Sequence, residues 1–126
     1  RNRGGGVTFS AVLPFPPSVN HYWVPIGRGR VVVSDEGKRF RQAVRQAVAD
    51  ERSGTLGDTA RLEVAIDVYP PDRRRRDLDN VLKSLLDALG HAGVYGDDSQ
   101  IDFLQISRRQ VDPPGSVAVR VMAIPT

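Results

Sequence analysis

The sequence predicts a small α+β domain with a mixed or antiparallel sheet and two main helices. Segments in which every second residue is apolar alternate with segments in which apolar residues recur every three or four positions. In chain order, these segments predict a strand, a short strand, a helix, a strand, a helix and two closing strands. Because 126 residues suffice for one hydrophobic core and are too few for two, we expect a single domain over residues 7–126.

The N-terminal quarter of the chain contains the first two expected strands. Residues 7–13 alternate between apolar and other side chains, which predicts a strand with one buried face. Prolines interrupt residues 16–23, and we expect an ordered loop there. A glycine-containing turn at residues 27–30 leads into a short strand over residues 31–33.

Two amphipathic helices follow. Ser34 occupies the N-cap position of a helix predicted over residues 35–50, with two acidic residues in the first turn, where the helix dipole favours anions. A second helix is predicted over residues 80–92, with glycines at its end. The apolar stripes comprise Phe40, Val44 and Val48 in the first helix, and Val81, Leu82, Leu85, Leu86 and Leu89 in the second.

Three further segments predict strands. Residues 62–68 alternate strictly, and two prolines end the segment. Residues 101–111 and 117–124 predict two closing strands, joined by a turn at residues 112–115.

The composition excludes several classes of protein. Without cysteine the chain has no disulfide framework, zinc–thiolate site or thiol nucleophile, which favours a reducing compartment, by default the cytoplasm. No apolar run approaches the roughly 20 residues that a membrane-spanning helix needs, so we expect no membrane association. Residues 1–6 are basic and glycine-rich with no apolar segment behind them, and are expected to be a disordered arm or a non-native remnant.

The positive charge is concentrated in two short runs. The net charge is +3 and the sequence pI is about 9.8. Clustered cations favour a polyanionic partner such as nucleic acid, and a solvated surface is the alternative. The runs comprise Lys38, Arg39 and Arg41 in the first helix, and Arg73, Arg74, Arg75 and Arg76 after the third strand.

Asp77 and Asp79 form a close acidic pair. In an extended segment, residues separated by one position project from the same side, a few ångströms apart. Such a pair is stable when it is solvated, shares a proton or faces a cation, and hard divalent cations prefer oxygen ligands. The alternative is that one aspartate caps the helix beginning near Asn80 and the other lies in solvent.

A second acidic pair, Asp97 and Asp98, follows the second helix. That helix spans roughly 20 Å, and the extended segment after it can return about the same distance. Asp98 is therefore predicted to meet Asp77 and Asp79 near the helix N-terminus. Three carboxylates on one or two Mg²⁺ ions suit phosphodiester hydrolysis, because the metals activate a water and offset the charge of the attacked phosphate.

Basic residues accompany these acids. Lys83, four residues after Asp79, lies on the same face of the predicted helix, as a phosphate contact or as a partner in a weak ion pair. Asp87, one turn further, is expected to lie on the surface. The arginine run at residues 73–76 directly precedes the acids, which favours a site that draws a phosphate backbone onto a metal.

Aromatic and imidazole side chains give weaker indications. Tyr22 and Trp23 are candidates for stacking on bases exposed at a branched position, and anchoring their loop to the core is the alternative. His21 and His91 have no partner at metal-ligand spacing and are expected to be structural or exposed.

A set of motifs is spread along most of the chain. They are LPFPPS at residues 13–18 with Asn20 and Tyr22, the segment from Gly29 to Gly37 entering the first helix, DRRRRDLDN at residues 72–80, Lys83 with residues 87–89, and Asp97, Asp98 and Gln100. This combination resembles the RusA-type endodeoxyribonucleases, which resolve Holliday junctions. The central arginine–aspartate motif together with the downstream acid pair is the most specific part of the resemblance.

The resemblance implies a homodimer with one active site per subunit, which nicks two symmetry-related strands of four-way branched DNA with Mg²⁺ or Mn²⁺ as cofactor. It implies that Asp77, Asp79 and Asp98 are metal-binding catalytic acids and that Asp97 is a fourth acid at the metal. It also implies that Lys83 lies near the scissile phosphate. The residues expected to contact DNA are Asn20, Tyr22, Lys38, Arg41, Arg73, Arg74, Arg75, Arg76 and Asn80.

Two other functions stay open from the sequence. One is a metal-dependent nuclease that uses the same acids on flaps or other branched DNA. The other is a non-catalytic DNA-binding accessory protein, such as a phage-encoded factor, whose acids merely cap a helix.

Overall fold

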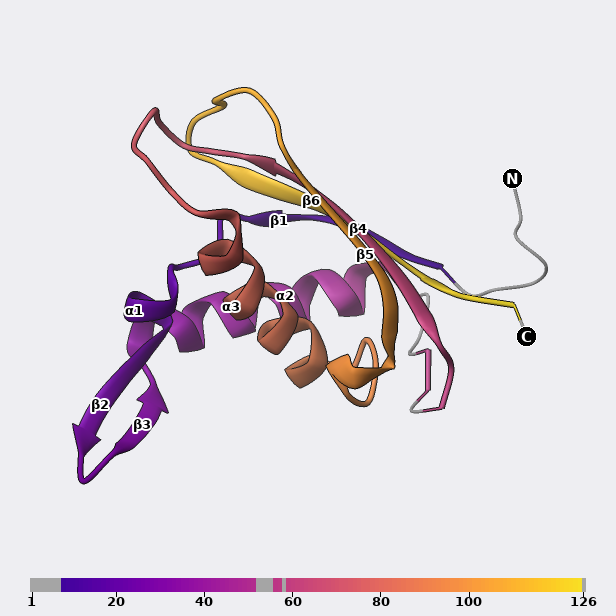
Figure 1. The fold of residues 1–126 in the computed structure, drawn as a ribbon, viewed down its shortest axis with the longest axis horizontal. Helices are drawn as coiled ribbons and strands as arrows, with labels where there is room; N and C mark the ends of the chain where they lie inside the picture. The colour runs from indigo at the N-terminus through magenta and orange to yellow at the C-terminus, as the bar shows by residue number, and fades with distance from the viewer. Residues whose placement is uncertain (1–7, 52–55, 58, 126) are drawn as a thin grey trace.

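The computed structural model describes residues 8–51, 56–57 and 59–125. It is an α+β fold in which two long helices lie against one face of a four-stranded sheet, while a two-stranded hairpin projects from one end (Figure 1). The predicted class is therefore confirmed. The arm expected at residues 1–6 lies outside the described residues.

The large sheet is mixed, with strand order β1-β6-β4-β5. β6 (Ser116–Ala123) pairs antiparallel with both β1 (Thr8–Pro14) and β4 (Leu62–Tyr69). β5 (Ile101–Arg108) pairs parallel with β4, because α3 (Leu78–His91) connects these two strands as a crossover. Both predicted closing strands are found, although β5 ends three residues earlier than expected, and β4 separates them in the sheet.

Alternation along the strands determines which face is buried. In β4, Leu62, Val64, Ile66 and Val68 are buried and their neighbours are half-buried. These four side chains face the helices, as the alternating sequence predicted. The opposite face of the sheet is open, and Val12 on it is 72% exposed.

α2 (Asp35–Glu51) begins as predicted after Ser34, whose hydroxyl oxygen accepts a hydrogen bond from the Gly37 amide at 2.9 Å. This bond satisfies one of the amides left unpaired in the first turn of a helix. Phe40 and Val44 are buried on the stripe that the periodicity predicted, and Val48 packs against the same core.

α3 begins at Leu78, two residues earlier than expected. Val81, Leu85 and Leu89 are buried against the sheet, and the hydroxyl of Ser84 donates to the carbonyl of Pro17 at 2.6 Å. This bond ties the helix to the proline-rich segment after β1. In the part of the chain described here, no helix is both long enough and apolar enough to cross a membrane.

The segment expected to be a loop at residues 16–23 contains a short helix, α1 (Val19–Tyr22). The prolines restrict only the residues up to Ser18, whose carbonyl then accepts the amides of His21 and Tyr22. β2 (Trp23–Gly27) and β3 (Arg30–Val33) form the projecting hairpin, and the predicted turn is confirmed by positive φ angles at its tip.

Candidate active site

Asp77 and Asp79 lie at the start of α3. The early start of the helix makes Asp77 its N-cap residue and places Asp79 in the first turn, so the two are not in an extended segment as predicted. The Asp77 side chain accepts no capping hydrogen bond, although its backbone carbonyl accepts the Asn80 amide at 3.2 Å. Capping therefore does not account for either carboxylate, and both residues are exposed.

One cavity of about 320 Å³, here called the acidic cavity, brings several of the predicted residues together. Asp79 and Lys83 line it from one face of α3, and Asp98 lines it from the segment that follows the helix. Among the described residues, no hydrogen bond or ion pair engages these three side chains. The remaining lining residues are Val19, Asn80, Leu82 and Leu86.

Gln100 fixes the turn that carries Asp98. Its side chain is 3% exposed, and its carbonyl oxygen accepts the amides of Gly96 and Asp97 at 2.8 and 2.9 Å. Its amide nitrogen donates to the carbonyls of Gly57 and Ala60 at 3.2 and 2.8 Å. The sequence motif included Gln100, but only the fold reveals that its side chain ties this turn to the segment before β4.

Asp97 does not line the acidic cavity but lines a neighbouring cavity that Asp98 also lines. Its carboxylate accepts the Ser99 amide at 3.0 Å and caps the short 3₁₀ turn that includes Asp98. Hydrogen bonds from Ser99 hold the pKa of Asp97 below its usual range. This neighbouring cavity lies on the side of α3 that carries Asp87 and His91.

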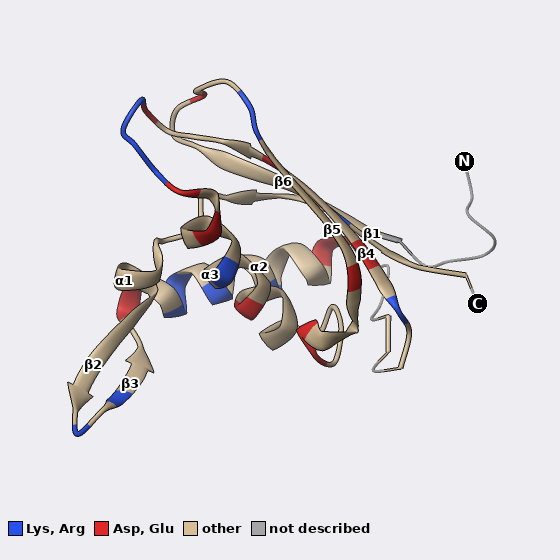
Figure 2. Cartoon of the chain, viewed as in Figure 1, with Lys and Arg blue, Asp and Glu red and all other residues tan. Residues whose placement is uncertain are grey.

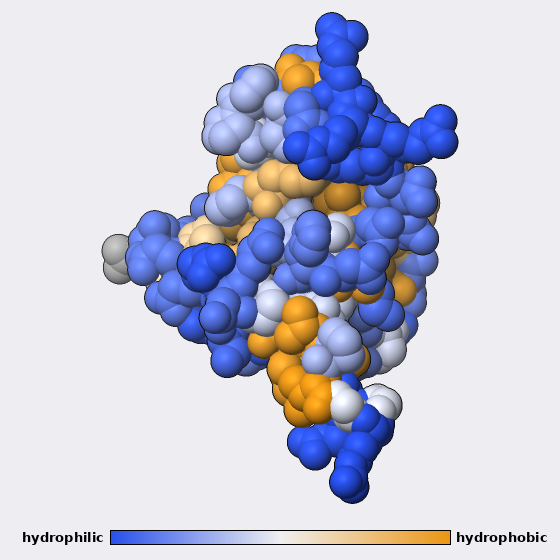
Figure 3. Space-filling view, turned by 90° about the vertical axis from the view of Figure 1, so that its left-hand side faces the viewer, coloured by the Kyte–Doolittle hydropathy of each residue, from blue (hydrophilic) through white to orange (hydrophobic). Residues whose placement is uncertain are grey.

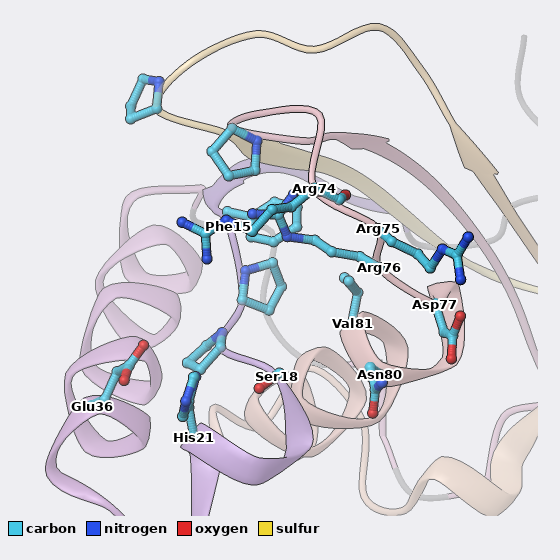
Figure 4. Close-up of a pocket in the computed structure, with 14 residues that line it drawn as sticks. Phe15, Ser18, His21, Glu36, Arg74, Arg75, Arg76, Asp77, Asn80 and Val81 are labelled. Atoms are coloured by element: carbon cyan, nitrogen blue, oxygen red, sulfur yellow. Dashed lines mark hydrogen bonds between the residues drawn. The ribbon is translucent and has the colours of Figure 1, made fainter.

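A larger cavity of about 570 Å³, here called the proline–arginine cavity, adjoins the start of α3 (Figure 4). Asp77 lines this second cavity, and Asn80 lines both. The predicted meeting of three carboxylates is therefore found in part: Asp79 and Asp98 share one cavity and Asp77 lies in its neighbour.

The donor set of the acidic cavity suits a hard cation, although the protein alone does not complete a cage. Within residues 8–51, 56–57 and 59–125, no group of three or more acidic or histidine side chains is assembled to hold a metal ion. Mg²⁺ usually keeps several waters and takes only one or two carboxylates from the protein. The carboxylates of Asp79 and Asp98 fit that pattern.

Residues 73–76, here called the arginine loop, precede the acids between β4 and α3 (Figure 2). Arg73, Arg74 and Arg75 are exposed. Arg76 is held in place, because it pairs with Asp72 at 2.8 Å and its guanidinium lies 5.3 Å from the centre of the Phe15 ring. The loop therefore presents three exposed cations beside the candidate site.

Asp72 stabilises the base of the arginine loop. Its carboxylate accepts the amide of Arg74 at 2.9 Å, in addition to its ion pair with Arg76. The hydrogen bond from Arg76, followed by that from Arg74, lowers the pKa of Asp72.

The structure contradicts the predicted DNA contact by Tyr22. This side chain is 0% exposed, and its hydroxyl donates to Asp87 at 2.5 Å and accepts from Arg41 at 2.8 Å. Arg41 also pairs with Asp87 at 2.8 Å, so Asp87, which was expected to lie on the surface, is half-buried and ion-paired. Tyr22 anchors α1 to α2 and α3, with Trp23 packed edge-to-face against its ring.

The other residues expected to contact DNA are dispersed. Asn20 in α1 and Lys38 in α2 are exposed, and neither lines the acidic cavity. His21 and His91 are exposed as predicted. Of the predicted DNA contacts outside the arginine loop, only Asn80 lies at the acidic cavity.

The fold and its cavities define a small α+β domain in which carboxylates and a lysine without partners among the described residues lie next to a cationic loop. Comparison with known proteins matches residues 14–122 to the family described as endodeoxyribonuclease RusA. The chain therefore belongs to the RusA family and is an endodeoxyribonuclease.

Individual relatives cover nearly the whole chain. The crossover junction endodeoxyribonuclease rusA of Enterobacteria phage HK97 is 38% identical over 113 residues, which are 90% of this chain and 92% of that protein. The enzyme of the same name from Escherichia coli K12 is 36% identical, and that from Enterobacteria phage 82 is 34% identical. Each of these two matches covers 90% of this chain and 93% of the relative.

Proposed function

We propose that this endonuclease resolves Holliday junctions by making paired, symmetric nicks in a metal-dependent reaction. Relatives over nine-tenths of the chain are named crossover junction endodeoxyribonucleases. The observation that carries the proposal is the acidic cavity, in which Asp79, Asp98 and Lys83 have no partner among the described residues. A cation between the carboxylates and a phosphate at the lysine would satisfy all three.

Asp79 and Asp98 would hold Mg²⁺, or Mn²⁺, with Asp77 at the edge of the site. When bound, the metal supplies activation of a water and neutralisation of charge on the attacked phosphate. Lys83, one helical turn from Asp79, would orient the scissile phosphate in the cavity. The arginine loop would draw the phosphate backbone towards the cavity by charge attraction.

Paired nicks favour a homodimer. A four-way junction has two equivalent strands related by a twofold axis, so two copies of one active site related by the same symmetry can cut both. We therefore propose that two copies of the chain act together. Sedimentation of the protein bound to one junction tests this stoichiometry.

A cleavage assay on three substrates tests the function. A four-way junction, a flap and a plain duplex are incubated with the protein, each with and without Mg²⁺. We expect Mg²⁺-dependent cutting of the junction at two symmetric positions and little cutting of the duplex. Preferential cutting of the flap would instead identify a flap nuclease, and no cutting of the junction in Mg²⁺ would refute the proposal.

The Asp79→Asn variant assigns the site. Because a neutral amide binds Mg²⁺ poorly while the basic surface is unchanged, we expect cleavage to be lost and junction binding to be retained. Asp35→Asn is the matched control, since Asp35 is also an exposed aspartate in the first turn of a helix. Normal cutting by Asp79→Asn, or equal loss in both variants, would refute the assignment.

A further inference from the structure

The proline–arginine cavity is the largest of the cavities described, and no step above gives its apolar wall a role. Its volume of about 570 Å³ lies within the roughly 300 to 1,000 Å³ typical of small-ligand sites. It is formed by the segment after β1, the arginine loop and the first turn of α3 (Figure 4). The segment after β1 lies more than 50 residues from the other two in the sequence and meets them only in the fold.

One part of its wall is apolar and ring-bearing. Phe15, Pro16, Pro17 and Pro71 line it, and Val81 contributes a further apolar side chain from α3. In the space-filling view, the hydrophilic upper end of this side of the molecule has hydrophobic atoms directly below it (Figure 3). Flat apolar surfaces of this kind are suited to contact the face of a nucleobase.

Three arginines line one side of the cavity, while Glu36 and Asp77 line other parts of it. Arg74 and Arg75 line it and are exposed, whereas Arg76 is fixed over Phe15. An apolar wall below guanidinium groups matches a ligand that carries an apolar ring and a phosphate. A nucleotide has that combination, and a purely apolar or purely anionic ligand would use only half of the site.

Another part of the cavity is lined by polar side chains that are available for hydrogen bonding to a ligand. Within the described residues, no hydrogen bond engages the side chains of Ser18, His21 or Asn80. Together they offer donors and acceptors that can meet the edge of a base. Pockets that receive an extruded base combine such edge contacts with apolar side chains on its faces.

The position of the cavity relates it to the proposed reaction. Asn80 lines both this cavity and the acidic cavity, so a ligand here would lie next to the phosphate held by Lys83. We propose that the proline–arginine cavity receives an unpaired base adjacent to the scissile phosphate and recognises its edge. This rests on the proposed function, since a branch point supplies bases that are least costly to unstack.

The first test measures extrusion of the base directly. The scissile phosphate is first located from the cleavage products, and 2-aminopurine then replaces each flanking nucleotide in turn. With EDTA present, so that nothing is cut, we expect binding of the wild-type protein to raise 2-aminopurine fluorescence at one flanking position. No rise at either position when the junction is fully bound would overturn the proposal.

Two variants link this response to the cavity. Ser18→Phe fills the cavity, and Ser10→Phe is its matched control on the open face of the sheet. We expect Ser18→Phe to abolish the fluorescence rise while junction binding, followed by anisotropy, is retained, and Ser10→Phe to behave as wild type. His21→Ala, at an exposed residue, adds no volume and keeps the test valid if Ser18→Phe does not fold.

Base preference gives the second measurement. Junctions carrying each of the four bases at the responding position are compared for cleavage rate. We expect the wild type to discriminate among them by about tenfold or more, since unpaired polar groups penalise the wrong base. His21→Ala should reduce this discrimination, and unaltered discrimination would refute recognition of the edge.

The outcomes separate this proposal from the proposed function. If the wild type cuts junctions but gives no fluorescence rise, the cavity proposal fails and the junction-resolving function stands. If the wild type does not cut junctions in Mg²⁺, the function itself fails.

Discussion

The side-chain carbonyl of Gln100 accepts a hydrogen bond from the backbone amide of Asp97 at 2.9 Å. The same oxygen accepts the Gly96 amide, so this buried side chain holds the turn that presents Asp98 to the acidic cavity. Because the contacts are to backbone atoms, they fix the path of the chain without restricting the carboxylate of Asp98. Gln100 is thus a positioning residue for the proposed metal site.

We expect Gln100→Ala to raise the Mg²⁺ concentration needed for half-maximal cleavage. The substitution leaves the carbonyls of Gly57 and Ala60 without their donor, which should lower the free energy of unfolding by about 1–3 kcal/mol. Mg²⁺ titrations are performed at a temperature where the variant is folded. Gln105→Ala, at an exposed residue of β5, is the control.

Gln100→Glu distinguishes positioning from general destabilisation. Glutamate keeps the acceptor oxygen for the turn but cannot donate to the loop carbonyls. We expect the free energy of unfolding of Gln100→Glu to fall. Its Mg²⁺ requirement should differ less from that of the wild type than the requirement of Gln100→Ala does. An unchanged Mg²⁺ requirement in Gln100→Ala would show that the turn does not position a metal ligand.

Lys83→Ala should slow cleavage without unfolding the protein. Lys83 is exposed and has no partner among the described residues, so its removal disturbs no packing. Loss of a charge that stabilises a transition state typically slows a reaction by roughly a hundredfold or more. Single-turnover cleavage and thermal unfolding are measured in parallel, with Arg45→Ala, at an exposed cation of α2, as control. Activity that merely follows the folded fraction would indicate a structural lysine.

The elements of the fold that were predicted correctly are those that the local sequence pattern determines. The alternation from Leu62 to Val68 specifies a strand with one buried face in any surroundings. Strand order was not predictable: the turn after β5 suggested neighbouring strands, whereas β4 lies between β5 and β6. Which strands pair depends on the crossover through α3, and no local pattern encodes it.

The site shows the same division between local and long-range information. The acids and Lys83 could be proposed as site residues from their spacing around one helix. The burial of Tyr22 could not be predicted, because Asp87 lies 65 residues away and only the packing of α1 on α3 brings the pair together. Of the two roles that the sequence left open for Tyr22, stacking on a base or anchoring its loop, the buried position favours the anchor.

The arginine loop should set the salt dependence of DNA binding. Removing one side chain that neutralises a phosphate lowers the slope of log affinity against log salt concentration by about 0.9 for duplex DNA. We expect Arg73→Ala, Arg74→Ala or Arg75→Ala each to reduce the slope by up to this amount, measured by anisotropy in EDTA. Arg120→Ala, at an exposed cation on the open face of the sheet, should leave the slope unchanged. Equal effects from both regions would mean that DNA does not bind selectively at the loop.

The stability of the fold should fall at high pH because of Tyr22. Burial, followed by the hydrogen bond to Asp87, raises the pKa of this hydroxyl from 10.0 to about 12. A raised pKa in the folded state contributes stability that is fully present below pH 10 and is lost as the pH rises towards 12. Urea unfolding across this range should show that loss in the wild type.

Tyr22→Phe should show a smaller loss over the same range. Phenylalanine cannot ionise, so the part of the pH dependence that arises from Tyr22 disappears, and the remainder includes Tyr95, whose pKa burial also raises. At neutral pH the variant should lose about 0.5–1.5 kcal/mol, the value of a typical hydrogen bond, because Arg41 still pairs with Asp87. Identical slopes above pH 10 in the two proteins would mean that the Tyr22 hydroxyl ionises as readily in the folded chain as in the unfolded one.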